Sequence, residues 1–447
     1  MRHDLRRCAL HQHDQPILHP VSRRRPMDGH RGNIAGPARR RRRRYRNHRH
    51  RDTEQQGRSG TARRVSAMKI TRIQGYPLSA DLGARYGGGN FEFSTARLVL
   101  VKVDTDEGLT GYATLHGHAM KEVCALLPQL QPLLHDLDAM SHEAIWQRLF
   151  DVSTSSPATT SFEPRRSVIS NDKFAVLMRC IAGIDIALWD IKGKASNLPV
   201  WKLLGASRDT MPAYVTGGYY RSDRDNMRFH GELASYVDEG FSTVKIKIGA
   251  LPVDEDLKRV REARAEIGPD CKLILDANNA YTWQQAADAI RRFEAYDIHW
   301  FEEPVHWYDS VRALGKLSAL TKTPLSSGES EIHGWACRDL VDMGGIRIMQ
   351  YDATRGAGAT DWLRVAAYCN LHGVTMSTHH QPHIQCHLTA AMPNGGIAET
   401  FSTSARDPFW DELYVERAQL KAGAIHLSDR PGFGFDIDWG TVTRYQA

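Results

Sequence analysis

Three carboxylates recur at nearly equal intervals in the second half of this 447-residue chain. Asp276 lies in DAN, Glu302 in FEEP and Glu329 in GES, spaced by 26 and 27 positions. If each carboxylate ends a strand of one parallel barrel, the three meet at one rim and repel one another. A hard divalent cation relieves that repulsion, and oxygen ligands suit Mg²⁺ better than zinc. The alternative is a set of separate salt bridges to nearby Lys or Arg residues.

Four further strand ends carry groups that can move protons or hold a charge. Lys245 and Lys247, in the segment KIK, lie two residues apart, so their side chains share one face of a strand. A Lys beside another cation has a depressed pKa and can act as a base. Asp352 and His379 end neighbouring predicted strands, where the carboxylate would orient the imidazole and raise its basicity. Glu399 either is protonated and donates a hydrogen bond to a substrate carboxylate, or pairs with a Lys.

Eight short β-rich segments hold these residues. The segments recur about every 20–30 residues, a helical stretch follows each, and they span 212–217, 243–249, 272–278, 298–304, 324–330, 346–352, 374–379 and 397–401. This alternation predicts an α/β fold, a β/α barrel of the TIM type, whose active residues lie at the carboxyl ends of its strands. An open dinucleotide-binding sheet is excluded, because Gly87, Gly88 and Gly89 follow no suitable strand and open no helix.

A separate α+β domain precedes the barrel. We place this domain at 68–195 and the barrel at 196–405, and we expect 406–447 to return to the first domain. The domain's pattern predicts strands at 68–78 and 96–105, and helices at 119–135, 141–151 and about 174–195.

Several residues near the predicted rim are candidates for substrate binding. Asn278 follows Asp276 by two positions, and Tyr219 and Tyr220 follow the first barrel strand. His116 and His118, in LHGH, come from the first domain. An ordinary surface loop is an equally good explanation for the two His residues.

Three other segments lie outside the predicted catalytic set. The segment ARYGGGNFEF at 84–93 is either a mobile lid over the site or an ordinary surface loop. The polar insertion 153–167 is expected to be exposed. We assign no metal to His380, His383 and His387, because packing explains them.

The first 67 residues differ in composition from the rest. They contain 19 Arg, no Lys and five acidic residues, with an unbroken Arg run at 39–44. Such a segment cannot bury a core and is expected to be disordered. A nucleic-acid arm or a targeting peptide is one interpretation. We favour another, that translation normally starts at Met68 and the extension is not native.

The remaining residues have the composition of an ordinary globular protein. They carry 39 basic and 47 acidic residues, so no basic face suggests nucleic acid. No apolar run reaches the roughly 18 residues of a membrane helix. Seven scattered cysteines without a CxxC pair indicate reduced thiols and a cytoplasmic location.

Taken together, these motifs resemble the enolase superfamily and, within it, the mandelate racemase-like subgroup. The resemblance covers Met68 to the end and rests on KIK (245–247), DAN (276–278), FEEP (301–304), GES (328–330), the Asp352/His379 pair and AET (398–400). It implies a modified (β/α)7β TIM-type barrel with an α+β capping domain. It also implies Mg²⁺ held by Asp276, Glu302 and Glu329.

The resemblance also implies roles for the remaining site residues. Lys247, with Lys245 beside it, would be the base on one face of the substrate, and His379, held by Asp352, would act on the other. Glu399 would contact the substrate carboxylate.

The expected reaction begins with removal of the proton next to a carboxylate. Most members of the subgroup look like acid-sugar dehydratases, so we expect a hydro-lyase that converts an aldonate or aldarate to a 2-keto-3-deoxy acid. A racemase or epimerase of a 2-hydroxy acid is the alternative within this chemistry. An inactive barrel kept as a binding protein is a third interpretation, but no expected ligand or base is missing. We expect a homo-oligomer with a small-molecule carboxylate substrate and no membrane partner.

Overall fold

The computed structural model describes residues 67–154, 173–206, 208–401 and 406–447. The predictions for residues 1–67 and 153–167 therefore lie almost entirely outside the described residues. No helix among those described is long and apolar enough to cross a membrane.

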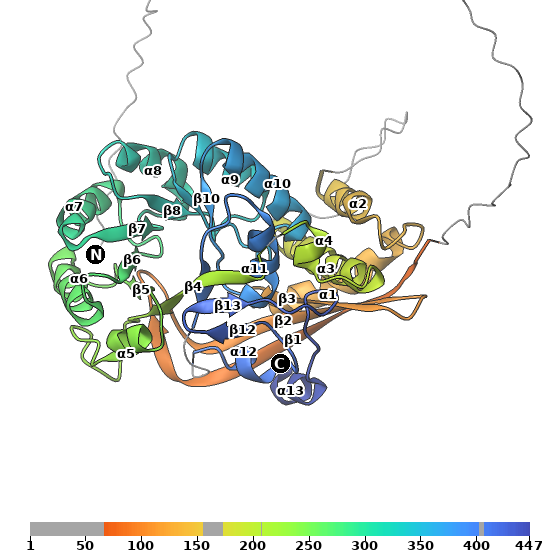
Figure 1. Ribbon diagram of the computed structural model, residues 1–447. Coiled ribbons are helices and arrows are strands. Elements are labelled where there is room, and N and C mark those ends of the chain that lie inside the picture. Colours follow the sequence, from red (N-terminus) through yellow and green to blue (C-terminus); the bar gives the residue numbers. More distant parts are fainter. Residues whose placement is uncertain (1–66, 155–172, 207, 402–405) are drawn as a thin grey trace, which may run out of the picture. The chain divides into compact units, whose positions relative to one another are not determined.

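Eight parallel strands form a closed barrel (Figure 1). They are β4 (Thr210–Gly217), β5 (Thr243–Lys247), β6 (Lys272–Asp276), β7 (Ile298–Glu302), β8 (Leu325–Ser327), β9 (Ile348–Met349), β10 (Thr375–Met376) and β11 (Ala398–Thr400). Each pairs with the next from β4 to β10, and β11 pairs with β4. Met376 closes the remaining gap, since its N–H donates to Asn394 at 2.9 Å and its carbonyl accepts from Gly396 at 2.7 Å. The predicted eight-strand barrel is confirmed.

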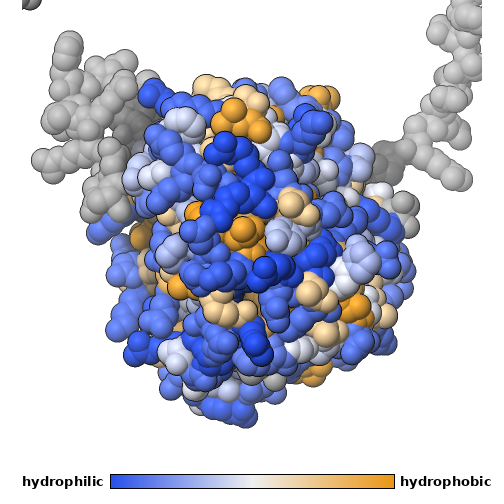
Figure 2. Space-filling view, turned by 90° about the vertical axis from the view of Figure 1, so that its left-hand side faces the viewer, coloured by the Kyte–Doolittle hydropathy of each residue, from blue (hydrophilic) through white to orange (hydrophobic). Residues whose placement is uncertain are grey.

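A helix follows each of the first seven barrel strands. These are α5 (Glu232–Asp238), α6 (Val253–Ile267), α7 (Trp283–Phe293), α8 (Ser310–Ser318), α9 (Gly334–Asp342), α10 (Gly358–Leu371) and α11 (Pro382–Ala391). Local sequence sets where they begin. Three acidic residues, 254–256, occupy the first turn of α6, where their negative charge interacts favourably with the positive end of the helix dipole. Thr282 and Gln285 form a capping box at the start of α7. Over part of this helical layer the surface is mainly hydrophilic, with small separated apolar spots (Figure 2).

Strand β5 shows how the barrel buries charge at its mouth. All five residues of TVKIK are buried. Val244 and Ile246 belong to the main hydrophobic core, whereas Lys245 and Lys247 alternate with them and point the other way. Below the lysines, Tyr214, Ile274, Trp300 and Ile348 form a separate buried apolar cluster, with the Tyr214 hydroxyl 3.5 Å from the Lys245 amine. The barrel floor is therefore apolar and its mouth ionisable.

The first domain is a three-stranded antiparallel sheet covered by helices. The sheet comprises β1 (Ile70–Gly87), β2 (Glu92–Thr105) and β3 (Thr110–His116), and the helices are α1 (Met120–Leu130), α2 (His142–Thr154), α3 (Phe174–Ala195) and the short α4 (Val200–Leu203). Most of α3 is buried because it lies between this sheet and α10. Its Gly183 is close enough to Val101 that an added Cβ would lie 2.7 Å from that side chain.

The hairpin between β1 and β2 is longer than the sequence predicted. Strand β1 does not end at residue 78 but continues to Gly87, and β2 begins at Glu92, so that only residues 88–91 form a connecting loop. The tip sits on the barrel mouth, where a Cβ on Gly89 would lie 1.8 Å from the Ala277 carbonyl oxygen. Gly87 and Tyr220 exchange two backbone hydrogen bonds, of 2.8 and 3.1 Å. Neither Gly88 nor Gly89 has a positive φ, so these glycines serve close approach.

The C-terminal residues contact both parts of this structure. Strand β13 (Ala424–His426) pairs antiparallel with β4 of the barrel and with β12 (Gln419–Lys421). The short α12 (Pro408–Glu412) precedes them, and α13 (Trp439–Tyr445) contacts β1. The domain boundaries given above remain a prediction.

Candidate active site

The three predicted metal ligands meet at the barrel mouth. Asp276 and Glu302 are paired in register at the ends of β6 and β7, and Glu329 follows β8. One oxygen from each carboxylate lies within 4.8 Å of the others, and all three residues are buried. Burial, together with the neighbouring carboxylates, raises the pKa of Glu302 to about 8, although Lys245 opposes the shift. An all-oxygen set that is short of positive charge fits a divalent cation such as Mg²⁺.

Two buried lysines pair with this cluster. The Lys245 amine lies 2.6 Å from Glu302, 2.8 Å from Glu399 and 3.6 Å from Asp276. The Lys247 amine lies 2.5 Å from Asp276. The salt bridges predicted as the alternative to a metal site therefore exist. They involve Asp276 and Glu302, two of the three carboxylates of the predicted metal site.

The pKa expected for Lys247 is wrong for this arrangement. Burial alone lowers the pKa of that amine, and Lys245 lowers it further, but Asp276 outweighs both and the pKa is raised. Repulsion between the two lysines acts in the expected direction, but it is the smaller effect. The barrel places the Asp276 carboxylate only 2.5 Å from the Lys247 amine, where its attraction is stronger than that repulsion.

The predicted His–Asp pair forms as expected. Nδ1 of His379 lies 2.9 Å from Asp352, and Nε2 lies 3.5 Å from Glu329. The other oxygen of Asp352 accepts hydrogen bonds from Thr354 and from Gln385, which fix its orientation. Burial lowers the pKa of His379, but Glu329 and Asp352 outweigh burial and raise it to about 9. In this arrangement His379 is therefore protonated at neutral pH and can donate a proton.

Glu399 pairs with a Lys, which was the second of its two predicted states. Its carboxylate accepts hydrogen bonds from Thr216 at 2.6 Å and from the His380 backbone N–H at 3.0 Å, and it lies beside Lys245. Burial raises the pKa of Glu399, but Lys245 and the neighbouring imidazoles hold it well below its usual range. Glu399 is therefore ionised here, and the protonated form expected as a donor to substrate is wrong.

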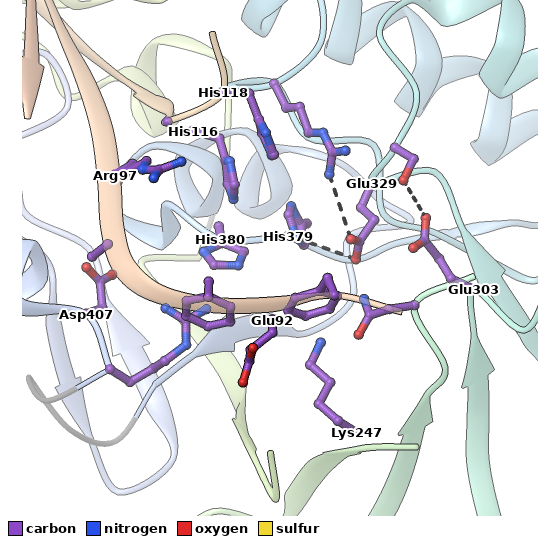
Figure 3. Close-up of a pocket in the computed structure, with 18 of the residues that line it drawn as sticks. Glu92, Arg97, His116, His118, Lys247, Glu303, Glu329, His379, His380 and Asp407 are labelled. Atoms are coloured by element: carbon purple, nitrogen blue, oxygen red, sulfur yellow. Dashed lines mark hydrogen bonds and ion pairs between the residues drawn. The ribbon is translucent and has the colours of Figure 1, made fainter. Parts of the chain in front are cut away.

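A cavity of about 540 Å³ opens above these groups. Lys247, Glu329 and His379 line its barrel side, and residues of the β1–β2 hairpin line the opposite side. Figure 3 shows Lys247 and His379 entering from different sides, with Glu329 next to His379. The volume lies within the range of small-molecule sites.

Most of the predicted substrate contacts line this cavity. Asn278, Tyr219, His116 and His118 all do so. Oδ1 of Asn278 and Nδ1 of His116 are buried without a hydrogen-bond partner among the described residues. Tyr220 is the exception, because its hydroxyl donates to the buried carboxylate of Asp256, away from the cavity. The hypothesis that Tyr220 binds substrate is wrong.

The histidines after β10 divide into two groups. His383 and His387 lie in the buried helix α11, where His383 contacts Thr114 at 3.1 Å and His387 accepts from the Trp201 backbone at 3.3 Å. Packing explains both, as predicted. His380 instead lines the cavity, and its ring lies 4.4 Å from the ring of His379.

Sequence reasoning missed Glu303. It is buried directly after Glu302 at a positive φ of 38°. Its carboxylate accepts from Asn279 at 2.5 Å and from Ser330 at 2.9 Å, which joins the ends of β6, β7 and β8. The second Glu of FEEP was the available signal, but strand alternation pointed it away from the site.

Sequence reasoning also missed three arginines. Arg355 follows Asp352 by three residues and lies 3.9 Å from Glu329. Arg406 donates to the Tyr219 hydroxyl at 3.2 Å, and Arg97 comes from β2. All three line the cavity. None lies at the carboxyl end of a barrel strand, which is where active residues of such barrels are expected.

A barrel whose mouth carries ionisable groups beneath a capping domain is typical of metal-assisted enzymes. Sequence comparisons identify the family. The pattern described as "Enolase C-terminal domain-like" matches residues 228–441. The "Mandelate racemase / muconate lactonizing enzyme, N-terminal domain" matches residues 91–205. The chain belongs to the enolase superfamily and to its mandelate racemase-like subgroup.

Individual relatives extend over most of the chain. An arabinonate dehydratase from Saccharolobus solfataricus is 28% identical, over 78% of this chain and 90% of its own length. A D-galactarolactone cycloisomerase from Agrobacterium fabrum is 28% identical, over 85% and 99%. The crystal structure of a mandelate racemase/muconate lactonizing enzyme from a marine actinobacterium, in complex with magnesium, is 32% identical with a TM-score of 0.74, and the match covers 85% of this chain and 99% of that one.

Proposed function

We propose that this protein is a magnesium-dependent hydro-lyase that removes the proton next to the carboxylate of an acid sugar and expels the neighbouring hydroxyl. The product would be a 2-keto-3-deoxy acid. The observation that carries the proposal is a cavity that Lys247 and His379 enter from different sides and that Glu329 also lines. Glu329 belongs to a cluster with the fully buried Asp276 and Glu302, in which one oxygen of each carboxylate lies within 4.8 Å of the others. Two similar proteins support the proposal: one is named an arabinonate dehydratase, and the structure of the other was solved in complex with magnesium.

Asp276, Glu302 and Glu329 would hold the magnesium ion. When bound, the ion supplies positive charge for the negative charge that develops on the substrate carboxylate. Asp276 would then share its charge with the ion, and its effect in raising the pKa of Lys247 would weaken. Lys245, close to the same carboxylates, favours the neutral amine of Lys247 further.

In the first step, Lys247 takes the proton from the carbon next to the carboxylate, and the electron pair of that C–H bond moves toward the carboxylate. In the second step the electrons return, the bond from the next carbon to its hydroxyl breaks, and His379 protonates the leaving oxygen to give water. The resulting enol becomes the 2-keto acid by proton transfer to carbon. Glu329 would share its charge with the ion, but Asp352, which is not among the proposed ligands, also raises the pKa of His379 and favours the protonated donor.

Reprotonation of the same carbon from the opposite side would instead give a racemase or epimerase. The placement of Lys247 and His379 on different sides of the cavity also favours that outcome. The two reactions differ in their products, since only the hydro-lyase forms a 2-keto acid.

The decisive experiment is a screen of the purified protein with Mg²⁺ against aldonic acids, aldaric acids and their lactones. We expect 2-keto acid formation from at least one acid. In parallel, NMR in deuterated water would detect exchange of the proton next to the carboxylate. Exchange with inversion and without a keto acid would establish a racemase or epimerase, and no exchange in any compound would refute proton abstraction. The homo-oligomeric state and cytoplasmic location remain predictions.

A further inference from the structure

The end of the cavity farthest from the carboxylate cluster carries a cation that nothing in the described structure balances. Arg97 of β2 lines the cavity, and its exposed side chain makes no hydrogen bond or ion pair with any described residue. Figure 3 shows Arg97 opposite Glu329, with His116 and His380 between them.

The other cations of the cavity have partners or fixed positions. Arg355 lies beside Glu329, at the cluster end. Arg406 donates to Tyr219, and its guanidinium lies 4.5 Å from the ring of Phe93 and 4.4 Å from that of Phe401. Lys247 pairs with Asp276. Arg97 therefore differs from every other cation that lines the cavity.

The acidic residues near Arg97 do not neutralise it. Glu92 pairs with Arg85 at 3.3 Å. Burial raises the pKa of Asp407, and the charge that remains on it is balanced by its neighbour Arg406. Burial also holds the pKa of His116 well below its usual range, so that imidazole is neutral and adds no charge of either sign. Arg97 is therefore left without a carboxylate partner among the described residues.

The backbone fixes where Arg97 lies. Leu98 pairs with His116 across β2 and β3, so Arg97 stands beside Gly117. A Cβ on Gly117 would lie 2.3 Å from Arg97, which shows how closely the two backbones approach. His116 in turn stacks on His379 at 5.9 Å, so Arg97 lies one layer of side chains beyond the proton donor. Phe93 and Thr95 share the face of β2 that carries Arg97 and also line the cavity.

We propose that Arg97 binds a second anionic group at the far end of the substrate, so that the preferred substrate is a dicarboxylate, an aldarate-type acid sugar with a carboxylate at each end. This inference rests on the proposed function for the reacting end of the substrate. The planar guanidinium binds a carboxylate through paired hydrogen bonds, whereas the terminal hydroxyl of an aldonate offers no charge.

The test compares matched acids that differ only in the far end. For pairs such as galactarate and galactonate, kcat/KM is measured for the protein, for Arg97→Gln and for Arg97→Lys. We expect the unaltered protein to prefer the diacid. Arg97→Gln should lower the ratio of kcat/KM for diacid over monoacid by about 10- to 100-fold, as loss of a charge-assisted hydrogen bond predicts. Arg97→Lys should retain part of the preference.

Arg72→Gln is the matched control, because Arg72 is on β1 of the same hairpin, is exposed and does not line the cavity. It should leave the diacid-to-monoacid ratio unchanged. A preference for the monoacid, or an unchanged ratio in Arg97→Gln, would overturn the proposal even if dehydration is observed.

A second readout does not need turnover. Calorimetry in the presence of Mg²⁺ measures binding of adipate, which has two carboxylates, and of hexanoate, which has one. Tighter binding of adipate that is lost in Arg97→Gln supports the anion subsite even if no acid is dehydrated, in which case only the proposed function fails. Equal binding of the two acids, or a preference that survives in Arg97→Gln, overturns the subsite.

Discussion

The two sides of the cavity treat their ionisable groups in opposite ways. On the barrel side, Lys245, Lys247, Asp276 and Glu302 are buried and bound to one another at 2.5–3.6 Å. On the capping side, Arg97 has no partner among the described residues, and Nδ1 of His116 lies buried without one.

This difference indicates how the work is divided. Groups that must hold a defined charge and position for proton transfer are held by one another and by the rigid strand ends. Groups that bind the variable part of a substrate keep donors and acceptors free for it. A substitution on the barrel side should therefore change the chemical step, whereas one on the capping side should change preference among substrates.

The largest effect should come from separating the two proton-transfer groups. Lys247→Ala should lower both dehydration and exchange of the proton next to the carboxylate by about 10²- to 10⁴-fold. His379→Asn should lower dehydration to a similar extent but leave exchange, since the base remains. Lys258→Ala, on an exposed surface pair with Glu255, is the control. Normal turnover in His379→Asn would mean that the His–Asp pair is only structural.

Loss of one carboxylate should come next. Glu302→Gln removes an anionic oxygen, and we expect at least a 10-fold loss of Mg²⁺ affinity, measured by calorimetry, with a parallel loss of activity. Glu303→Gln is the matched comparison, because its amide oxygen can still accept from Asn279 while its amide N–H donates to the Ser330 hydroxyl. Its loss should be smaller. Full activity after exhaustive chelation would contradict the magnesium requirement.

On the capping side, Gly89→Ala should have a moderate effect. The added Cβ would meet the Ala277 carbonyl at 1.8 Å and push the hairpin tip off the barrel mouth. We expect kcat/KM to fall by about 10-fold, which corresponds to about 1.4 kcal/mol, with little change in melting temperature. Gly87→Ala on the same hairpin, where the nearest atom would be 3.4 Å away, is the control. Equal kinetics for the two variants would mean that the tip does not shape the site.

The smallest effect on turnover should come from Asp185, which joins the two regions. This α3 carboxylate accepts the Thr360 N–H at 2.8 Å and its hydroxyl at 2.6 Å, and so caps α10. Burial raises the pKa of Asp185 to about 7, so the folded protein binds a proton there that the unfolded chain releases near pH 4. The stability contributed by this group is therefore greatest below about pH 4 and declines as the pH rises to about 7.

Asp185→Asn mimics the protonated acid and should remove that dependence. Denaturant unfolding of both proteins at pH 5, 6 and 7 measures it. The free energy of unfolding of the variant, relative to the unaltered protein, should increase across this range by an amount on the order of a few kcal/mol. A constant difference between the two proteins would show that Asp185 does not titrate there.

The chemistry-bearing strand ends were predictable because barrel topology fixes which end of a strand faces the site. Asp276, Glu302, Glu329 and His379 therefore came together as expected. What the sequence did not provide is everything set by neighbours from distant segments. Tyr219 and Tyr220 look equivalent in sequence, yet only the structure shows that Asp256 binds the second hydroxyl.

Charge states were also beyond the sequence. The pKa of Lys247 depends on whether attraction to Asp276 or repulsion from Lys245 is the stronger effect. The 2.5 Å distance between the Lys247 amine and Asp276 decides this, and that distance cannot be read from the order of residues along the chain. The hairpin was missed because Gly87, Gly88 and Gly89 suggested a flexible loop. Their role is to let two backbones approach, which depends on the position of Ala277.

The lysine that links the barrel carboxylates has a consequence for how the protein matures. Because the Lys245 amine lies within 2.8 Å of both Glu302 and Glu399, part of the buried negative charge is compensated from within the chain. The barrel can thus complete its folding before any ion arrives, unlike small zinc domains that are unfolded without their metal. Magnesium loading then becomes a reversible, late event, so a preparation stripped by a chelator should regain its activity on adding the ion back, without refolding.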